Sequence, residues 1–227
     1  MKELSKLEIK KLIGKEDPII LDIGCYDGKD SVELASLFNS CEIHCFEADF
    51  RSIKLFKHIN KNTKHKLFLH EIAIGSVDGK INFYLSDSET RRHYKFQKEW
   101  SASSSIKKPK VHLELFKDVQ FNKKVKVQCC KLDTWCEKKW DWGNINNKII
   151  DLIWCDVNGA EKDLILGGMN VLNNFTRYFY TEFCAKELYE GSLTYRQILK
   201  LLPNFNVVSV YNFQGNFGNL LLKNKNL

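Results

Sequence analysis

The most constraining feature of this chain is a short apolar run that leads into a glycine-spaced turn. Residues 19–23 are apolar except for Asp22, a pattern typical of a strand buried on both faces of a parallel sheet. Gly24 and Gly28 follow, and residues 29–38 then carry an amphipathic helical pattern. Such a strand, turn and helix predict a cradle for a nucleotide-like ligand, because glycines allow close backbone approach and the helix start attracts negative charge.

The glycine spacing excludes a dinucleotide fingerprint. Tyr26 occupies the second glycine position of G-x-G-x-x-G, so a pyrophosphate cannot press against the backbone there. A second acidic strand end, Glu47, comes 25 residues after Asp22 and can accept hydrogen bonds from both ribose hydroxyls. Together the two signals indicate an adenosine-type ligand. The alternative for Glu47 is a solvated acid at a strand end.

Length and composition favour one α/β domain over residues 1–227. The chain is 44% hydrophobic and 28% charged, which is ordinary for a globular protein. No run approaches the roughly 18 to 20 apolar residues of a membrane span, and the N-terminus lacks the apolar core of a signal peptide. These features predict a cytoplasmic protein without a membrane span.

The charge argues against a nucleic-acid-binding protein, and the cysteine pattern argues against a structural zinc site. The net charge of +7 comes from scattered lysines and only 5 arginines, whereas arginine is the usual choice for recognising phosphates and bases. Nucleic acid is therefore disfavoured as a partner. The 8 cysteines include no C-x-x-C pair and no zinc-ligand spacing, which predicts free thiols of an intracellular protein.

The rest of the chain alternates helical and strand patterns. Helices are predicted at 3–14, 50–60, from Leu132 with Asp133 as N-cap, around 161–166 and at 195–202. Strands are predicted at 41–47, 67–74, 81–85, 125–129, 149–156 and 178–183, with a closing antiparallel pair at 207–211 and 218–222.

Residues 86–124 break this alternation. A long segment of low periodicity inside a compact domain is either a functional lid or a solvated insertion. This one carries polar and aromatic groups suited to binding a polar ligand, and His93 is an alternative base. As lid residues that contact an acceptor we predict Arg91, Arg92, Tyr94, Trp100 and Ser103.

Several blocks together resemble the FkbM family of methyltransferases. They are Asp22-Ile23-Gly24, Phe46-Glu47-Ala48, Ala73-Ile74-Gly75, Ser103-Ser104-Ser105, Leu132-Asp133-Thr134-Trp135 and the most specific block, residues 151–161. The resemblance spans roughly residues 17–222. It implies a Rossmann-like class I fold, with a seven-stranded, mostly parallel sheet and a C-terminal antiparallel pair. It also implies S-adenosylmethionine as cofactor and O-methylation, commonly of sugars or natural products. The chain departs from the family at Trp154 and Asn158, where Lys and Glu are usual.

Two carboxylates are the candidates for the transfer chemistry. Asp156 and Glu182 each end an apolar strand, and those strands are neighbours in the implied sheet. The pair could act as base and orienting group or hold a divalent cation, and the alternative is that each caps a following helix or turn. For cofactor contacts we predict Asp22, Gly24, Cys25, Gly28, Ser31, Glu47, Ala48, Ala73, Ile74 and Asp156.

The sequence thus predicts an S-adenosylmethionine-dependent O-methyltransferase that acts on a hydroxyl of a sugar or glycan. One alternative is an RNA 2′-O-methyltransferase, disfavoured by the scattered lysines and by Trp154 where a lysine would be needed. The other is a catalytically inactive module that binds the cofactor as a scaffold.

Overall fold

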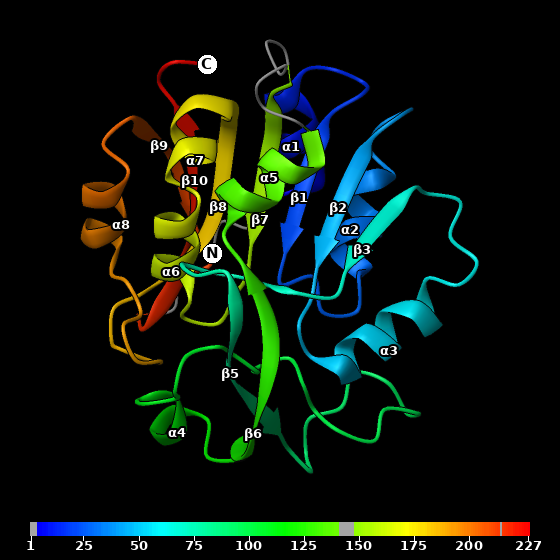
Figure 1. The fold of residues 1–227 in the computed structure, drawn as a ribbon, viewed down its shortest axis with the longest axis vertical. Helices are drawn as coiled ribbons and strands as arrows, with labels where there is room; N and C mark the ends of the chain where they lie inside the picture. The colour runs from blue at the N-terminus through cyan, green and yellow to red at the C-terminus, as the bar shows by residue number, and fades with distance from the viewer. Residues whose placement is uncertain (1–3, 141–147, 214) are drawn as a thin grey trace.

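A seven-stranded sheet forms the centre of the protein, in a computed structural model that describes residues 4–140, 148–213 and 215–227. Its strand order is β3-β2-β1-β7-β8-β10-β9 (Figure 1). Only β10 runs antiparallel to its neighbours, so the predicted mostly parallel sheet with a C-terminal antiparallel pair is confirmed. The strands are β1 (Ile19–Ile23), β2 (Glu42–Phe46), β3 (Leu67–His70), β7 (Ile150–Cys155), β8 (Thr176–Cys184), β9 (Phe205–Tyr211) and β10 (Phe217–Asn224).

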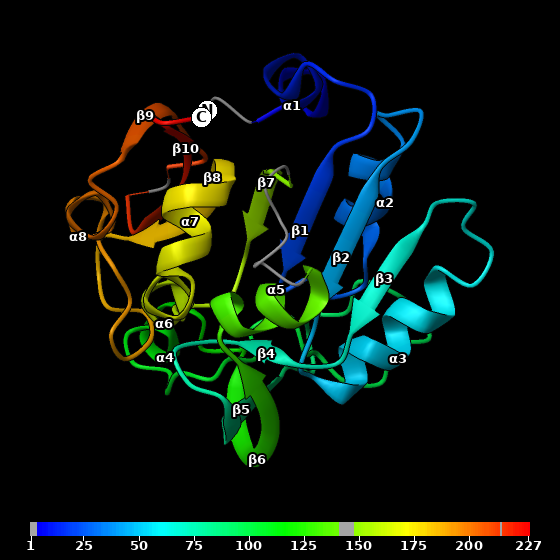
Figure 2. The ribbon, with the colours of Figure 1, turned by 45° about the horizontal axis from the view of Figure 1, so that its top comes forward.

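Helices cover both faces of this sheet (Figures 1 and 2). One apolar cluster joins the sheet to α1, α2 and α3, and a second joins the opposite face to α5, α6, α7 and α8. This arrangement explains the continuous apolar runs, because Ile20 and Leu21 are consecutive and both fully buried, one on each face. The helices are α1 (Lys6–Ile13), α2 (Lys29–Ala35), α3 (Phe50–Ile59), α4 (His112–Leu115), α5 (Leu132–Trp140), α6 (Glu161–Gly167), α7 (Met169–Phe175) and α8 (Tyr195–Leu201).

The N-terminal helix forms as its capping signals suggest. The Ser5 side chain accepts a hydrogen bond from the backbone N–H of Glu8, and the helix ends at Gly14, whose φ is +69°. α1 therefore begins at Lys6, later than predicted, and residue 3 of the predicted helix lies outside the described residues.

The predicted strand 67–74 is wrong as a single element. β3 ends at His70, which pairs with Phe46, the last residue of β2. The strand pairs of the described residues give 71–74 no partner in the main sheet. Residues Ala73–Ile74 form β4, which pairs instead with Cys129 and Cys130 in a separate three-stranded sheet. That sheet has the order β4-β6-β5, with β5 at Gly79–Asp87 and β6 at Gln120–Cys130.

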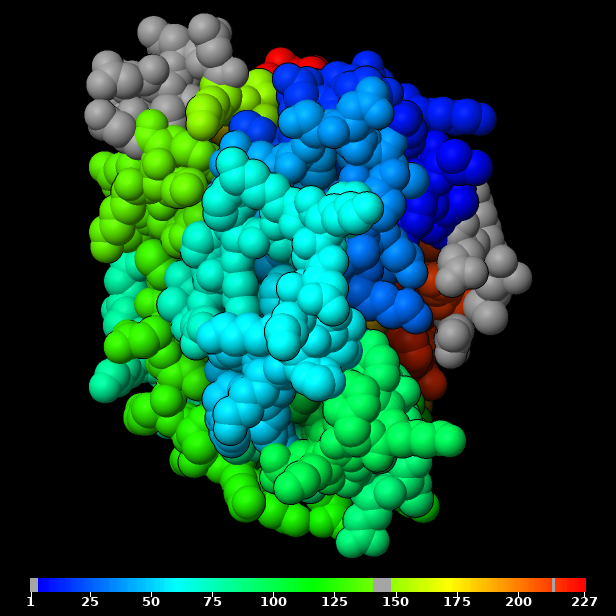
Figure 3. Space-filling model, turned by 90° about the vertical axis from the view of Figure 1, so that its right-hand side faces the viewer, coloured from blue at the N-terminus to red at the C-terminus, as the bar shows by residue number. Residues whose placement is uncertain are grey.

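Part of the segment 86–124 forms regular secondary structure, and the segment lies beyond the carboxyl ends of the strands of the main sheet (Figure 1). Its two ends belong to β5 and β6, and α4 lies between them. The connecting chain is held by an isolated bridge between Ser105 and Tyr84 and by another between Pro109 and Tyr189. In Figure 1 the segment lies below the carboxyl ends of β1 and β2, and in Figure 3 its green surface abuts the cyan surface of α3.

Asp133 does not cap its own helix, which corrects the prediction. It is the second residue of α5, and its carboxylate accepts hydrogen bonds from the backbone N–H groups of Asn170 (3.2 Å) and Val171 (2.9 Å). Asp133 therefore caps the start of α7, an element 36 residues further along the chain.

Candidate active site

A cavity of about 240 Å³ opens at the carboxyl ends of β1, β2 and β7. This is where parallel sheets bind ligands, because the loops that follow the strands diverge there. Its wall includes most of the residues predicted for cofactor binding, namely Asp22, Gly24, Cys25, Glu47, Ala48, Ala73, Ile74 and Asp156. Gly28 and Ser31, which were also predicted, are not among the residues that line it.

Both glycines of the turn are required by close packing within the chain, and their predicted contact with a ligand stays a prediction. Gly24 has a φ of +88°, and a Cβ built there would lie 1.7 Å from the carbonyl oxygen of Asp156. Gly28 has a φ of +75°, and its Cβ would lie 2.3 Å from the ring of Phe56 in α3. Both positions need glycine because neighbouring chain segments approach too closely for a side chain.

Asp22 lies at the base of the cavity, nearly buried. The Ser31 hydroxyl donates a hydrogen bond to its carboxylate, and Cys45 donates to Ser31 in turn (3.3 Å). Burial raises the pKa of Asp22 to about 7, although the bond from Ser31 opposes that shift. Ser31 thus fixes Asp22 in the position from which it faces the cavity.

Glu47 links the ends of β1 and β2. Its carboxylate accepts hydrogen bonds from the backbone N–H groups of Tyr26 (3.0 Å), Ala48 (2.7 Å) and Asp49 (2.7 Å). Burial raises its pKa to about 7, partly offset by these bonds. The side chain is held rigidly at the cavity wall, where ribose binding by Glu47 stays a prediction.

Asp156 follows β7, as predicted, but the prediction that Glu182 ends its strand is wrong, because β8 continues to Cys184 and Glu182 pairs with Asn219 of β10. Cys155 at the end of β7 pairs with Thr181 in β8, so each carboxylate comes directly after a paired position. Asp156 lines the cavity, whereas Glu182 is half-buried outside its lining.

The pKa values of these two carboxyl groups are both raised, but by different surroundings. Desolvation, with a smaller contribution from Asp30, raises the pKa of Asp156 to about 6. Burial raises the pKa of Glu182 well above its usual range, and the charges of Asp156 and Glu161 add to this shift. Within residues 4–140, 148–213 and 215–227, no three or more His, Cys, Asp or Glu side chains are arranged to hold a metal ion.

The cavity as a whole is acidic. No lysine or arginine among the described residues lines it, and His93 is its one imidazole. Its carboxylates are those of Asp22, Asp27, Asp30, Glu47 and Asp156. Such a wall favours a cationic ligand and disfavours a phosphate.

The five residues predicted to contact an acceptor all have partners within the chain. Arg91 forms a bidentate ion pair with Asp118 (2.5 and 3.0 Å), and Arg92 lies 3.3 Å from Asp87. The Tyr94 hydroxyl donates to Asp27 (2.7 Å), which ties the segment to the glycine turn. The Trp100 indole donates to the Ser103 hydroxyl (3.4 Å). None of the five lines the cavity, and their acceptor contacts stay a prediction.

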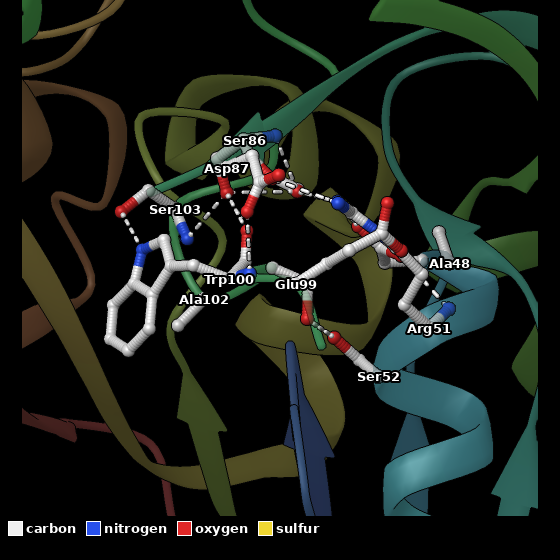
Figure 4. Close-up of polar contacts among 12 residues, drawn as sticks. Ala48, Arg51, Ser52, Ser86, Asp87, Glu99, Trp100, Ala102 and Ser103 are labelled. Carbon is white, nitrogen blue, oxygen red and sulfur yellow. Dashed lines mark hydrogen bonds and ion pairs between the residues drawn. The ribbon is translucent and has the colours of Figure 1, made fainter. Parts of the chain in front are cut away.

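Other residues of the segment form the cavity wall, and Arg51 in α3 holds them there. Its guanidinium donates to the Ser86 carbonyl (2.9 Å) and to the Ser104 hydroxyl (3.1 Å). The same guanidinium forms an ion pair with Asp49 (2.6 Å). Figure 4 shows this arrangement, in which the Arg51 side chain reaches from α3 toward Ser86. Among the wall residues of the segment, Arg51 contacts Ser104 directly. The residues of the segment that line the cavity are His93, Ser101, Ala102, Ser104, Ser105 and Ile106.

Asn158 fastens the same wall from the opposite side. Its amide donates to the carbonyl oxygens of Ala102 (3.1 Å) and Ser104 (3.3 Å), and the Ser105 hydroxyl donates to the Asn158 carbonyl (2.8 Å). The glutamate usual in the family could not donate these two bonds. The departure at Asn158 and the serine block were the only sequence signals for this contact.

Comparison with known proteins agrees with the geometry. Residues 22–212 match the methyltransferase FkbM domain. The chain is 39% identical over 220 residues to the 2-O-methyltransferase NoeI of Sinorhizobium fredii (strain NBRC 101917 / NGR234), covering 97% of this chain and 85% of the relative.

Solved structures share the fold at low sequence identity. A putative rRNA methylase from Clostridium thermocellum has a TM-score of 0.51 at 10% identity, covering 99% of this chain and 98% of that one. The magnesium protoporphyrin IX methyltransferase from Synechocystis PCC 6803, solved with bound SAM, has a TM-score of 0.50 at 9% identity, covering 96% and 79%. These likenesses show a class I methyltransferase fold.

Proposed function

This chain belongs to the FkbM family of methyltransferases, and from that premise we propose that it methylates a hydroxyl of a sugar or glycan. S-adenosylmethionine is the cofactor, and the relative named as a 2-O-methyltransferase supports an oxygen acceptor. The observation that carries the proposal is the acidic cavity with Asp156 in its wall.

The residues present fit S-adenosylmethionine. The cofactor carries a sulfonium and an ammonium, and the cavity wall supplies carboxylates with no lysine or arginine among the described residues. Glu47 would hold the ribose hydroxyls, and Ala73 and Ile74 would face the base. When bound, the cofactor supplies an electrophilic methyl group.

Asp156 is the residue we assign to the acceptor proton. With a pKa of about 6, its carboxylate is ionised at neutral pH and can take the proton of a hydroxyl held against it. Glu182, whose pKa is raised well above its usual range, would stay protonated on the neighbouring strand and serve as the orienting group. Two carboxyl groups on adjacent strands thus take different protonation states and different roles.

The same charge distribution bears on the alternatives. A phosphate of an RNA acceptor near this cavity would find no lysine or arginine among the described residues of its wall to neutralise it. A neutral sugar ring has no charge to neutralise. A scaffold module without activity would bind the cofactor equally well, so only turnover separates it from an enzyme.

The reaction is placed in the cytoplasm in this proposal. All eight cysteines are free thiols, which suits a reducing compartment. In the part of the chain that the structure describes, no helix has the length and apolarity to span a membrane.

The test is incubation of the full chain with methyl-labelled S-adenosylmethionine and a panel of glycans, read by mass spectrometry. We expect label on a sugar hydroxyl with wild type and none with Asp156→Asn. Label on an RNA 2′-hydroxyl would favour the first alternative. Cofactor binding without label on any acceptor would favour the scaffold.

A further inference from the structure

A short stretch of the segment 86–124, residues 93–100, which we name the strap, is hydrogen-bonded to the glycine turn. The Tyr94 hydroxyl donates to the Asp27 carboxylate (2.7 Å), and the Gln97 side-chain amide donates to the Tyr26 hydroxyl (2.9 Å). Tyr26 and Asp27 both line the cavity, and so does His93 of the strap. Two side-chain hydrogen bonds thus join the strap to the part of the wall where the cofactor is expected.

Tyr26 has an unusual backbone conformation. Its φ is +49°, in the left-handed region, which is strained for an aromatic residue. In this conformation the backbone N–H of Tyr26 donates to a carboxylate oxygen of Glu47 (3.0 Å). Because φ is the rotation about the bond from this nitrogen to Cα, a relaxed φ would turn the N–H relative to the rest of the residue. The hydrogen bond to Glu47 therefore depends on the strained conformation.

The side chain of Tyr26 is held by the strap. Besides the hydrogen bond from Gln97, its ring contacts His93 edge-on, with centroids 5.6 Å apart, and lies 6.5 Å from the ring of Trp100. The Gln97 amide is itself fixed, because it also donates to the Glu99 carbonyl (2.8 Å) and accepts from the backbone N–H of His93 (3.0 Å). A strained residue persists only where its surroundings hold it, and for Tyr26 the strap supplies those contacts.

The geometry points to Gln97 as a positioning residue for the cofactor. Its hydrogen bond to the Tyr26 hydroxyl keeps Tyr26 in the conformation from which the backbone N–H holds Glu47 in place. This inference rests on the role proposed for Glu47 as the ligand of the ribose. It assigns to the strap a part in binding S-adenosylmethionine, in addition to the acceptor contacts predicted for the same segment.

The experiment is calorimetric titration of the full chain with S-adenosylmethionine, for wild type, Tyr26→Phe, Gln97→Leu and the double variant. Tyr26→Phe removes the hydroxyl alone and keeps the ring beside His93 and Trp100. We expect each single substitution to raise the Kd about fivefold, the effect typical of one lost hydrogen bond. The double variant should also lose about fivefold and no more, because the same bond is absent in all three.

Hydrogen exchange of the backbone amide at position 26 reports directly on the bond to Glu47. Protection of this amide should fall about fivefold in Gln97→Leu, whereas exchange in β1 should not change. Lys95→Met is the matched control, because Lys95 is exposed on the same strap, and it should equal wild type in both measurements. If Gln97 only organises the strap through His93 and Glu99, protection will fall within the strap but not at position 26, and the inference is overturned.

The remaining outcomes separate this inference from the proposed function. Calorimetry with the cofactor needs no acceptor, so its result is independent of which hydroxyl is methylated. If Glu47→Ala weakens cofactor binding while Tyr26→Phe binds as wild type, Glu47 stands and the role of Gln97 is overturned. Losses that add in the double variant also overturn it, since the two side chains then act separately. If Glu47→Ala binds as tightly as wild type, the ribose role of Glu47 fails and the role of Gln97 fails with it.

Discussion

Substituting Asn158 with aspartate tests whether the wall of the cavity depends on the amide of this residue. Asn158 has a φ of +51°, a conformation that aspartate tolerates about as well as asparagine, so the backbone should not change. The substitution removes the donor that bonds the Ala102 and Ser104 carbonyls, at 3.1 and 3.3 Å. It also places a negative charge beside those two oxygens.

The magnitude follows from these contacts. One good neutral hydrogen bond contributes about 1 kcal/mol net, and the longer one contributes less. Repulsion between the new carboxylate and the two carbonyl oxygens brings the total to about 2 kcal/mol for residues 101–106. Because the hydrogen bonds from Arg51 to Ser86 and Ser104 remain, we expect local opening of this segment and not global unfolding.

The assay is amide hydrogen exchange of residues 101–106, with steady-state kinetics in parallel. Protection there should fall about 30-fold in Asn158→Asp, and the acceptor KM should rise. Asn158→Gly, which removes the donor without adding a charge, should show a smaller loss. Unchanged exchange in Asn158→Asp would refute the reasoning, because the side-chain amide of Asn158 would then contribute nothing to the stability of this segment.

Three further predictions concern the carboxylates. Glu47→Ala should weaken S-adenosylmethionine binding by about 2 to 3 kcal/mol in calorimetry, and unchanged affinity in a folded variant would reject Glu47 as the ribose ligand. Asp156→Asn should lower turnover about 10²-fold or more while cofactor affinity changes less than tenfold. If turnover in wild type vanishes with a chelator and returns with magnesium, Asp156 and Glu182 instead hold a cation. Buried Glu161 has its pKa raised to about 7, so its folded-state protonation stabilises the protein below pH 4.5, and that contribution is lost as pH rises toward 7. Glu161→Gln should therefore flatten this part of the stability curve in thermal melts, and an unchanged curve would contradict the shift.

Local patterns in the sequence were sufficient for the central elements. Consecutive apolar residues such as Ile20 and Leu21 require burial on both faces, and this condition alone selects a strand inside a parallel sheet. The neighbouring positions of Asp156 and Glu182 followed from the implied sheet order, because β7 and β8 are adjacent parallel strands, but the antiparallel pairing with β10 that extends β8 beyond Glu182 was not foreseen. The glycine positions were also visible in the sequence.

Several of these residues are required by contacts with segments that are distant in the sequence. Gly24 and Gly28 are required by Asp156 and Phe56, which approach them from elsewhere in the chain. Asp133 has the local pattern of an N-cap, yet it satisfies the start of another helix. Local sequence describes which groups need partners, but it does not say which distant segment supplies them.

The wall of the cavity and its charge were decided only by the tertiary structure. A segment of low periodicity such as 86–124 has no internal repeat of buried positions, so its conformation depends on outside partners. Those partners are Arg51 and Asn158, on two different elements. In the same way, Lys6 reaches Asp30 only because α1 packs beside α2 against the sheet. Sequence determined the strands and the carboxylates at their ends, whereas long-range packing determined which side chains surround them.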